Sequence, residues 1–238
     1  MTELLISDIT RMQPGYCVIG IEPTQTGFRS VRPIPERTYR WFRFPYRRAD
    51  KLTFDPISTP LTQPHFEDQF GANHRKVSSL TERELIQCLK KAEVGRSLKE
   101  LFGCNPRLSW AGSQAAYVIP DEAKRSICGC TFKSVRLSFE FYPPKVRVAL
   151  GLESGETLAN LPLVDRDWSD FIDEAARKAR NNSDPSFKIG DYFEHFAEER
   201  VASSPYRFAR IGLARPHGGK KCWLMLDSLF PLPRLDYP

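Results

Sequence analysis

The sequence lacks the segments that place a protein in a membrane or direct it to one. None of its apolar runs approaches the length that a membrane-spanning helix needs. The N-terminal residues, MTELLISDITRM, do not show a basic segment followed by a long apolar one, which is the pattern of a secretory signal. We therefore expect a cytoplasmic protein without a membrane partner.

The sequence also lacks the motifs of several enzyme classes. It has no glycine loop of the Walker or dinucleotide-binding type and no nucleophile elbow. Cys128 and Cys130 are spaced as half of a zinc site, whose other ligands would be Cys104, His217 or Cys222. The spacing is tighter than the usual one, and we favour reduced thiols. We expect no metal and no cofactor, and a binding protein is favoured over an enzyme.

The composition is that of a globular protein, with 41% hydrophobic and 27% charged residues in a chain of 238. Its formal net charge of +6 favours polyanionic partners, although an enzyme that binds an acidic compound would carry the same charge. The 19 prolines and 14 glycines divide the chain into short pieces, which favours strands and loops over a helical bundle.

Hydrophobic patterning predicts strands in both halves of the chain. Apolar runs at residues 4–6, 17–21 and 28–34 are separated by turn residues, as in a small antiparallel barrel. Residues 135–141 alternate apolar and polar side chains with period two, which indicates a half-buried strand. The last strands are expected at residues 208–213 and 222–229. The predicted fold class is therefore mainly β (α+β).

Two helices are predicted from local signals. Thr81 and Glu84 fit a capping box, after which Leu85, Ile86 and Leu89 share one face. A helical stretch that begins there and ends near residue 103 is the expected divider between two halves. Residues 168–179 show the apolar stripe of a second amphipathic helix.

Residues 27–51, GFRSVRPIPERTYRWFRFPYRRADK, alternate arginines with aromatic residues. Guanidinium groups pair with phosphates and aromatic faces stack on bases, so these are the residue types of a surface for single-stranded nucleic acid. The same alternation arises where rings enter a core and arginines stay in solvent. Both interpretations remain open. With two lysines of a later basic turn, the candidate nucleic-acid-binding residues are Arg29, Arg32, Arg40, Trp41, Arg43, Arg47, Arg48, Lys220 and Lys221.

Three of these candidate residues have a structural alternative that also remains open. Arg32 either points at a ligand or pairs with a buried carboxylate, for which Asp8 and Asp165 are candidates. Lys220 and Lys221 end the stretch HGGKK, which either cradles a phosphate or is a solvated turn.

His65, Glu67 and Asp68 place an imidazole and two carboxylates in one loop. Such a loop forms part of a metal or acid–base site, or its polar groups fix the loop through hydrogen bonds. We favour the hydrogen bonds, because the sequence shows no second carboxylate cluster to complete a nuclease site.

Short motifs in a fixed order resemble the prokaryotic dual OB-containing domain family. The family pattern runs from a Cys-(Ala or Val)-x-Gly strand through an aromatic-Ile-Arg-Pro element and a Pro-His-x-Glu-Asp loop to a Thr-Asp or Val-Asp pair and an Arg-x-Gly-Leu strand. The matching positions here are Cys17–Gly20, Val31–Pro33, Pro64–Asp68, Val164 with Asp165, and Arg210–Leu213.

This resemblance implies two OB-like barrels in tandem. With the helical stretch as the divider, we expect a first domain at residues 1–103, which includes the connecting helix, and a second at residues 104–238. It also implies a nucleic-acid-binding role, in the setting of prokaryotic conflict or defence systems. We expect a module that binds single-stranded RNA or DNA. The alternatives are a protein-interaction subunit of a larger complex, and a metal-dependent nuclease or phosphoesterase that uses the His65 loop.

Overall fold

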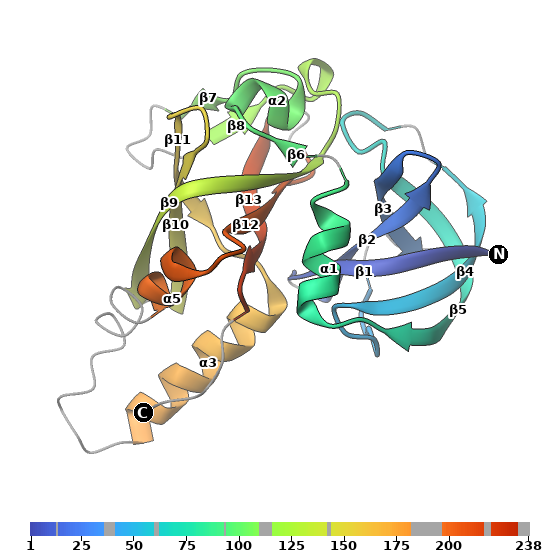
Figure 1. Cartoon of the computed structure of the whole chain (residues 1–238), viewed down its shortest axis with the longest axis horizontal. Coiled ribbons are helices and arrows are strands. Elements are labelled where there is room, and N and C mark those ends of the chain that lie inside the picture. The colour runs from blue at the N-terminus through green and yellow to red at the C-terminus, as the bar shows by residue number, and fades with distance from the viewer. Residues whose placement is uncertain are drawn as a thin grey trace.

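The computed structural model confirms a mainly β chain, which forms a closed barrel and a second, curled sheet (Figure 1). The structure describes residues 1–12, 14–35, 41–59, 62–92, 94–109, 116–141, 144–181, 197–216 and 220–232. Within these ranges no helix is long and apolar enough to cross a bilayer.

The barrel contains the first five strands, and its order is β1-β2-β3-β5-β4 with β4 paired back to β1. All neighbours are antiparallel except β3 and β5, which are parallel. A Cβ at Gly20 would lie 2.5 Å from Leu4 Cγ, so a side chain at Gly20 would clash with the buried Leu4. The strands are β1 (Thr2–Arg11), β2 (Tyr16–Thr24), β3 (Gly27–Pro35), β4 (Asp50–Ser58) and β5 (Asp68–Ser79).

The second sheet has the order β11-β10-β9-β12-β13-β8-β7, and β6 pairs with β9 outside this path. The period-two strand is confirmed: Val135 and Leu137 are buried in β9, and Arg136 between them is exposed. The strand begins at Ile127, earlier than the pattern indicated. The strands are β6 (Val94–Gly95), β7 (Arg107–Leu108), β8 (Ala116–Val118), β9 (Ile127–Phe141), β10 (Pro144–Leu152), β11 (Thr157–Pro162), β12 (Phe208–Leu213) and β13 (Cys222–Phe230).

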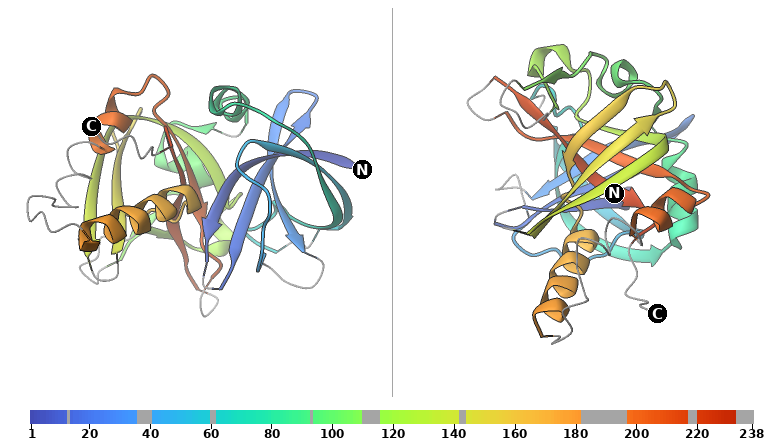
Figure 2. Two further views of the ribbon diagram at one scale, coloured as in Figure 1. Left: turned by 90° about the horizontal axis from the view of Figure 1, so that it is seen from below. Right: turned by 90° about the vertical axis from the view of Figure 1, so that its left-hand side faces the viewer.

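Helices connect and cover the two β structures. The capping box is confirmed, since Thr81 Oγ1 accepts from the Glu84 N–H and the Glu84 carboxylate accepts from the Thr81 N–H. From the end of the barrel, α3 extends along the second sheet and contacts β1 and β10 (Figure 2). The helical elements are α1 (Glu82–Leu89), α2 (Leu98–Phe102), the short 3₁₀ turn η1 (Pro120–Glu122), α3 (Arg166–Asn181) and α5 (Glu198–Ser203).

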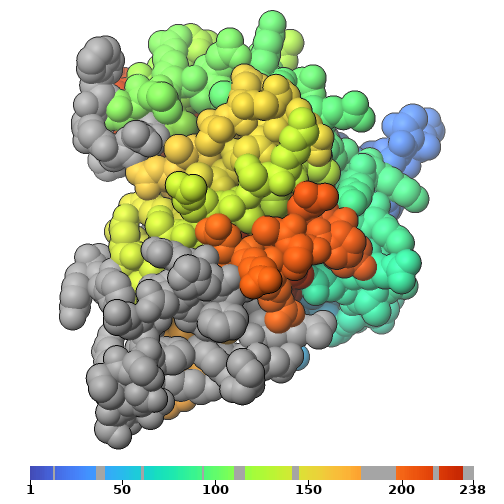
Figure 3. All heavy atoms as spheres, turned by 60° about the vertical axis from the view of Figure 1, so that its left-hand side comes forward, coloured from blue at the N-terminus to red at the C-terminus, as the bar shows by residue number. Residues whose placement is uncertain are grey.

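An apolar cluster joins the barrel to the second sheet. Leu5 and Ile21 from the barrel and Phe208 and Phe230 from the second sheet belong to this cluster, together with the buried face of α1. Tyr206, which follows α5, packs against the same cluster, and Figure 3 shows this segment in orange beside the teal α1 region. The two β structures therefore share a core in addition to the core that each has of its own.

The expected domain division at residue 103 stays a prediction. The two elements just before it, β6 and α2, pack with the second sheet: β6 pairs with β9, and Leu101 and Phe102 of α2 lie in the core of that sheet.

Candidate functional site

Buried ion pairs lie where the barrel meets the second sheet. Asp8 of β1 accepts hydrogen bonds from Ser7 Oγ and Ser228 Oγ, and one of its oxygens lies 3.3 Å from Arg210 Nε. Arg210 of β12 also donates to Ser30 Oγ at 3.0 Å. This pair joins β1 to β12, and both of its charged side chains are fully buried. Removal of either partner would leave the other charge buried without compensation, which would strongly destabilise the fold.

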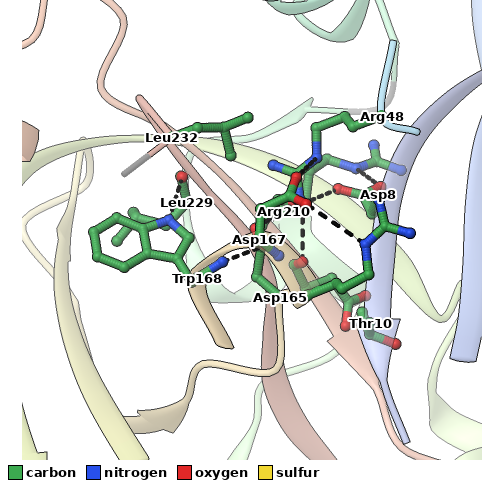
Figure 4. Close-up of polar contacts among 12 residues, drawn as sticks. Asp8, Thr10, Arg48, Asp165, Asp167, Trp168, Arg210, Leu229 and Leu232 are labelled. Carbon is green, nitrogen blue, oxygen red and sulfur yellow. Dashed lines mark hydrogen bonds and ion pairs between the residues drawn. The ribbon is translucent and has the colours of Figure 1, made fainter. Parts of the chain in front are cut away.

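A second buried pair joins Arg48, which precedes β4, to Asp165 (Figure 4). Arg48 Nη2 lies 2.8 Å from Asp165 Oδ2, so the two groups form an ion pair, but its geometry is not that of a hydrogen bond. Asp165 Oδ1 accepts from the N–H groups of Asp167 and Trp168, as an N-cap residue does, so it also fixes the start of α3. Burial raises the pKa of Asp165 to about 6, although the positive charge of Arg48 opposes the shift.

Arg32 pairs with Asp68, and not with the Asp8 or Asp165 considered from the sequence. Its Nη1 donates to Asp68 Oδ1 at 2.7 Å and to His65 Nδ1 at 3.0 Å, and its Nη2 donates to Ser126 Oγ at 3.2 Å. The guanidinium of Arg32 therefore faces protein groups and is almost fully buried.

The loop that contains His65 and Glu67 is tied to the second sheet by hydrogen bonds. The Glu67 carboxylate accepts from both the N–H and the hydroxyl of Ser126, and Asp68 accepts from Arg215 at 2.6 Å. Burial, with the nearby charges of Arg32 and Arg215, lowers the pKa of His65 to about 2, so its ring is neutral at ordinary pH. Among the described residues no group of His, Cys, Asp or Glu is arranged to hold a metal.

The rings of the arginine-rich stretch divide between the core and the surface. Phe44 is buried in the barrel core, and Trp41 and Tyr46 pack against that core. Trp41 Nε1 donates to the Pro33 carbonyl at 2.9 Å, and the indole meets the Phe44 ring edge-on. In contrast, Phe42 is 59% exposed. Trp41 thus packs partly on the barrel core.

The cations of the same stretch divide in the same way. Arg43 and Arg47 are exposed, and among the described residues neither side chain forms an ion pair. Arg29 is exposed and pairs with Glu22. Arg32 and Arg48 are buried and paired, a placement that does not favour contact with nucleic acid. Arg40 lies outside the described residues.

The basic turn before β13 is described only from Lys220 onward. Lys220 is exposed, and the Lys221 ammonium lies 4.4 Å from the centre of the Tyr117 ring and 5.7 Å from that of Trp223. Such cation–π contacts hold Lys221 over rings of the second sheet. His217 of this turn, and with it one of the zinc ligands considered above, falls outside the described residues.

Three charged or polar residues at the junction of the barrel and the second sheet were not predicted from the sequence, namely Ser126, Arg215 and Asp227. Asp227 is the one that a sequence signal could have identified. It is a lone carboxylate within the apolar strand CWLMLDSLF, and a charged residue in such a strand is buried together with its neighbours.

The chain was compared with protein-family models, with curated proteins and with solved structures, and none of the three comparisons gave a match.

Proposed function

We propose that this chain binds single-stranded nucleic acid through the exposed side of residues 42–47, with Phe42 as a stacking ring and Arg43 and Arg47 as phosphate contacts. The observation that carries the proposal is the division of this segment. Its buried side packs on the barrel core, and its other side presents the exposed ring of Phe42 next to Arg43 and Arg47, which form no ion pair among the described residues. Stacking and backbone charge are the two terms that sequence-tolerant single-strand binding needs.

The position of the segment supports this function because the barrel holds it firmly. Trp41 bridges to Tyr16 of β2, and the Tyr46 hydroxyl donates to the His74 carbonyl of β5 at 2.7 Å. Arg75, next to His74, is a further exposed cation without an ion pair among the described residues. A recognition segment whose backbone is fixed loses less conformational entropy when it binds.

The proposal extends to the fold family and its setting. A closed five-stranded barrel is compatible with an OB-like barrel, and the second sheet would be its partner in a tandem arrangement. On this proposal the chain is a cytoplasmic relative of the dual OB-containing domains and acts in a defence or conflict system.

The test is fluorescence anisotropy with labelled single-stranded RNA, single-stranded DNA and duplex DNA across a salt series. Wild-type affinity should fall linearly in log salt, and each phosphate contact on a single strand contributes about 0.7 to the slope. The double variant Arg43→Gln with Arg47→Gln should therefore reduce the slope by about 1.4. Phe42→Ala should weaken binding by about 1–3 kcal/mol without changing the slope.

A matched control removes two positive charges elsewhere. Arg96 and Lys99 are exposed near α2 on the second sheet, and their double substitution by Gln should leave the slope close to that of the wild type. The proposal fails if no ligand binds at low salt. It also fails if the control lowers the slope as much as the Arg43 and Arg47 variant does.

A further inference from the structure

A second surface with rings and cations lies on the second sheet, where β13, β8 and β7 are neighbours. Trp223 of β13 lies opposite Tyr117 of β8, and Tyr117 lies opposite Arg107 of β7. Directly opposite residues of antiparallel strands point to the same face, so these three side chains form a row across the sheet. Their sequence neighbours Leu224 and Val118 are buried, so the row lies on the face away from the core.

The two rings of this row are half-buried and meet edge to face, with their centroids 5.4 Å apart. In such a pair the partner covers a face of one ring only. The Lys221 ammonium lies 4.4 Å from the centre of the Tyr117 ring and 5.7 Å from that of Trp223, so it lies more closely over the tyrosine. Trp223 is therefore the better placed of the two rings to stack on a base.

The net charge of this surface is positive. Lys220 is exposed and Lys221 is half-buried, and neither forms an ion pair with the described residues. Arg107 pairs with Glu122, and that pair adds no net charge. Two ammonium groups beside an aromatic ring are complementary to a phosphate backbone with its bases. A partner with a purely apolar face would have to desolvate both cations without compensation.

The turn between β1 and β2 connects this surface to the nucleic-acid surface proposed above. On one side of the turn, a Cβ at Gly15 would lie 3.4 Å from Phe42 Cα, so the turn touches the first surface. On the other side, Met12 lines a cavity together with Ala214, whose N–H donates to the Trp223 carbonyl at 2.8 Å. Met12 is itself 40% exposed, so accessible surface lies between the two.

We propose that one nucleic-acid strand contacts both surfaces, with bases stacked on Phe42 and Trp223 and with phosphates at Lys220 and Lys221. This inference rests on the proposed function and specifies its ligand. The ligand is an oligonucleotide that reaches from the barrel, past the turn at Met12, to the second sheet. A duplex does not fit, because its bases are stacked on one another and are not free for either ring.

The test uses ¹⁹F NMR of the full chain labelled with 5-fluorotryptophan. The probe is an oligouridylate RNA of about 20 nucleotides, which exceeds the roughly 4–16 nucleotides that one OB-type unit covers. The chain has 4 tryptophans. Substitution by Phe assigns the signals of Trp41, Trp110 and Trp223, and the fourth signal belongs to Trp168.

Each signal reports on a different part of the molecule. Trp223 reports on the second surface, and Trp41, the neighbour of Phe42, reports on the first. Trp168 is 1% exposed and donates to the Leu229 carbonyl, so it serves as the internal reference. We expect the signals of Trp41 and Trp223 to shift over the same range of RNA concentration, with no shift of Trp168.

Charge variants test the same path without changing a ring. In anisotropy titrations with this RNA, Lys220→Gln with Lys221→Gln should reduce the slope of log affinity against log salt by about 1.4. Added to Arg43→Gln and Arg47→Gln, the reduction should total about 2.8, because all four cations then contact one strand. The control variant at Arg96 and Lys99 should again leave the slope close to that of the wild type.

The outcomes separate this inference from the proposed function. A shift of Trp41 without a shift of Trp223, or a slope unchanged by the lysine variant, would overturn the inference and leave the first surface standing. A shift of Trp223 alone would contradict both, because the strand would then not use the surface at Phe42. Bound RNA that shifts neither signal would also contradict both.

Discussion

Asp8, Asp165 and Asp227 are three carboxyls that the fold removes from water, and each is in a different electrostatic setting. Asp8 has hydroxyl donors and Arg210. Asp165 has Arg48 and the first N–H groups of α3. Asp227 has no side-chain hydrogen bond among the described residues, and Arg32 and Arg210 act on it only through their charge, so burial raises its pKa further than that of Asp165. Burial thus raises the pKa of both Asp165 and Asp227, and the cation and N–H donors at Asp165 keep its shift the smaller of the two.

Asp227 predicts a dependence of stability on pH. A pKa raised from 3.8 to about 8 means that the folded state binds this proton more tightly than the unfolded state, so wild-type stability falls as pH rises through this window. Asp227→Asn removes the effect. Relative to the wild type, its free energy of unfolding should rise by at least about 1.4 kcal/mol between about pH 5 and pH 9. Urea unfolding at the two pH values measures this, and an unchanged difference would contradict it.

The pair of Asp8 and Arg210 predicts strong coupling between two strands from different halves. Arg210→Met alone leaves Asp8 buried without its cation and should cost about 3–5 kcal/mol. Adding Asp8→Asn should cost much less than the sum of the single changes, as a double-mutant cycle in urea would show.

The exposed pair of Glu174 and Arg177 on α3 is the control for that cycle. Arg177 is 62% exposed and Glu174 is 29% exposed, so this pair should couple by less than about 0.5 kcal/mol. Additive costs at Asp8 and Arg210 would mean that the buried pair does not hold the halves together.

Among the elements, the segment from Trp41 to Arg47 shows how one alternating pattern serves two purposes. The sequence left open whether its rings lie in the core or form a contact surface. In the structure some of the rings are buried and others are exposed. Phe44 is buried in the barrel core, while Phe42 is exposed. The two interpretations thus apply to alternate residues of the same segment.

This division predicts opposite effects for two substitutions of the same kind. Phe44→Ala should destabilise the protein by about 3–5 kcal/mol, because it leaves a cavity in the barrel core. Phe42→Ala should change stability by no more than about 0.5 kcal/mol. Thermal unfolding of both variants measures this, and a large loss with Phe42→Ala would mean that the ring is structural.

Local elements were predictable from the sequence, and their partners were not. The capping box at Thr81 and the period-two strand around Leu137 depend on neighbours in sequence, so their signals are local. The partner of Arg32 is 36 residues away, and several buried carboxylates were equally reasonable candidates. The position of Asp227 over Gly212 and beside a cavity depends on how β13 pairs with β12, and no local sequence signal predicts that pairing.

For the whole molecule, the shared core predicts that the barrel does not fold independently. Residues 1–92 contain the barrel and α1, but Leu5, Ile21 and α1 would lose Phe208 and Phe230, and Arg48 would lose Asp165. We expect this fragment to show no cooperative unfolding transition in urea, while the full chain unfolds in a single one. A fragment with the same midpoint as the full chain would show that the junction contributes little.

The proposed nucleic-acid surface is tested most directly by photo-crosslinking. A single-stranded RNA that carries 5-bromouridine is bound to the full chain and irradiated, and the crosslinked residues are mapped by mass spectrometry. The account predicts crosslinks to the segment of residues 41–47, centred on Phe42, which are lost in Phe42→Ala. Crosslinks confined to other parts of the chain, or none under conditions in which the RNA is bound, would contradict it.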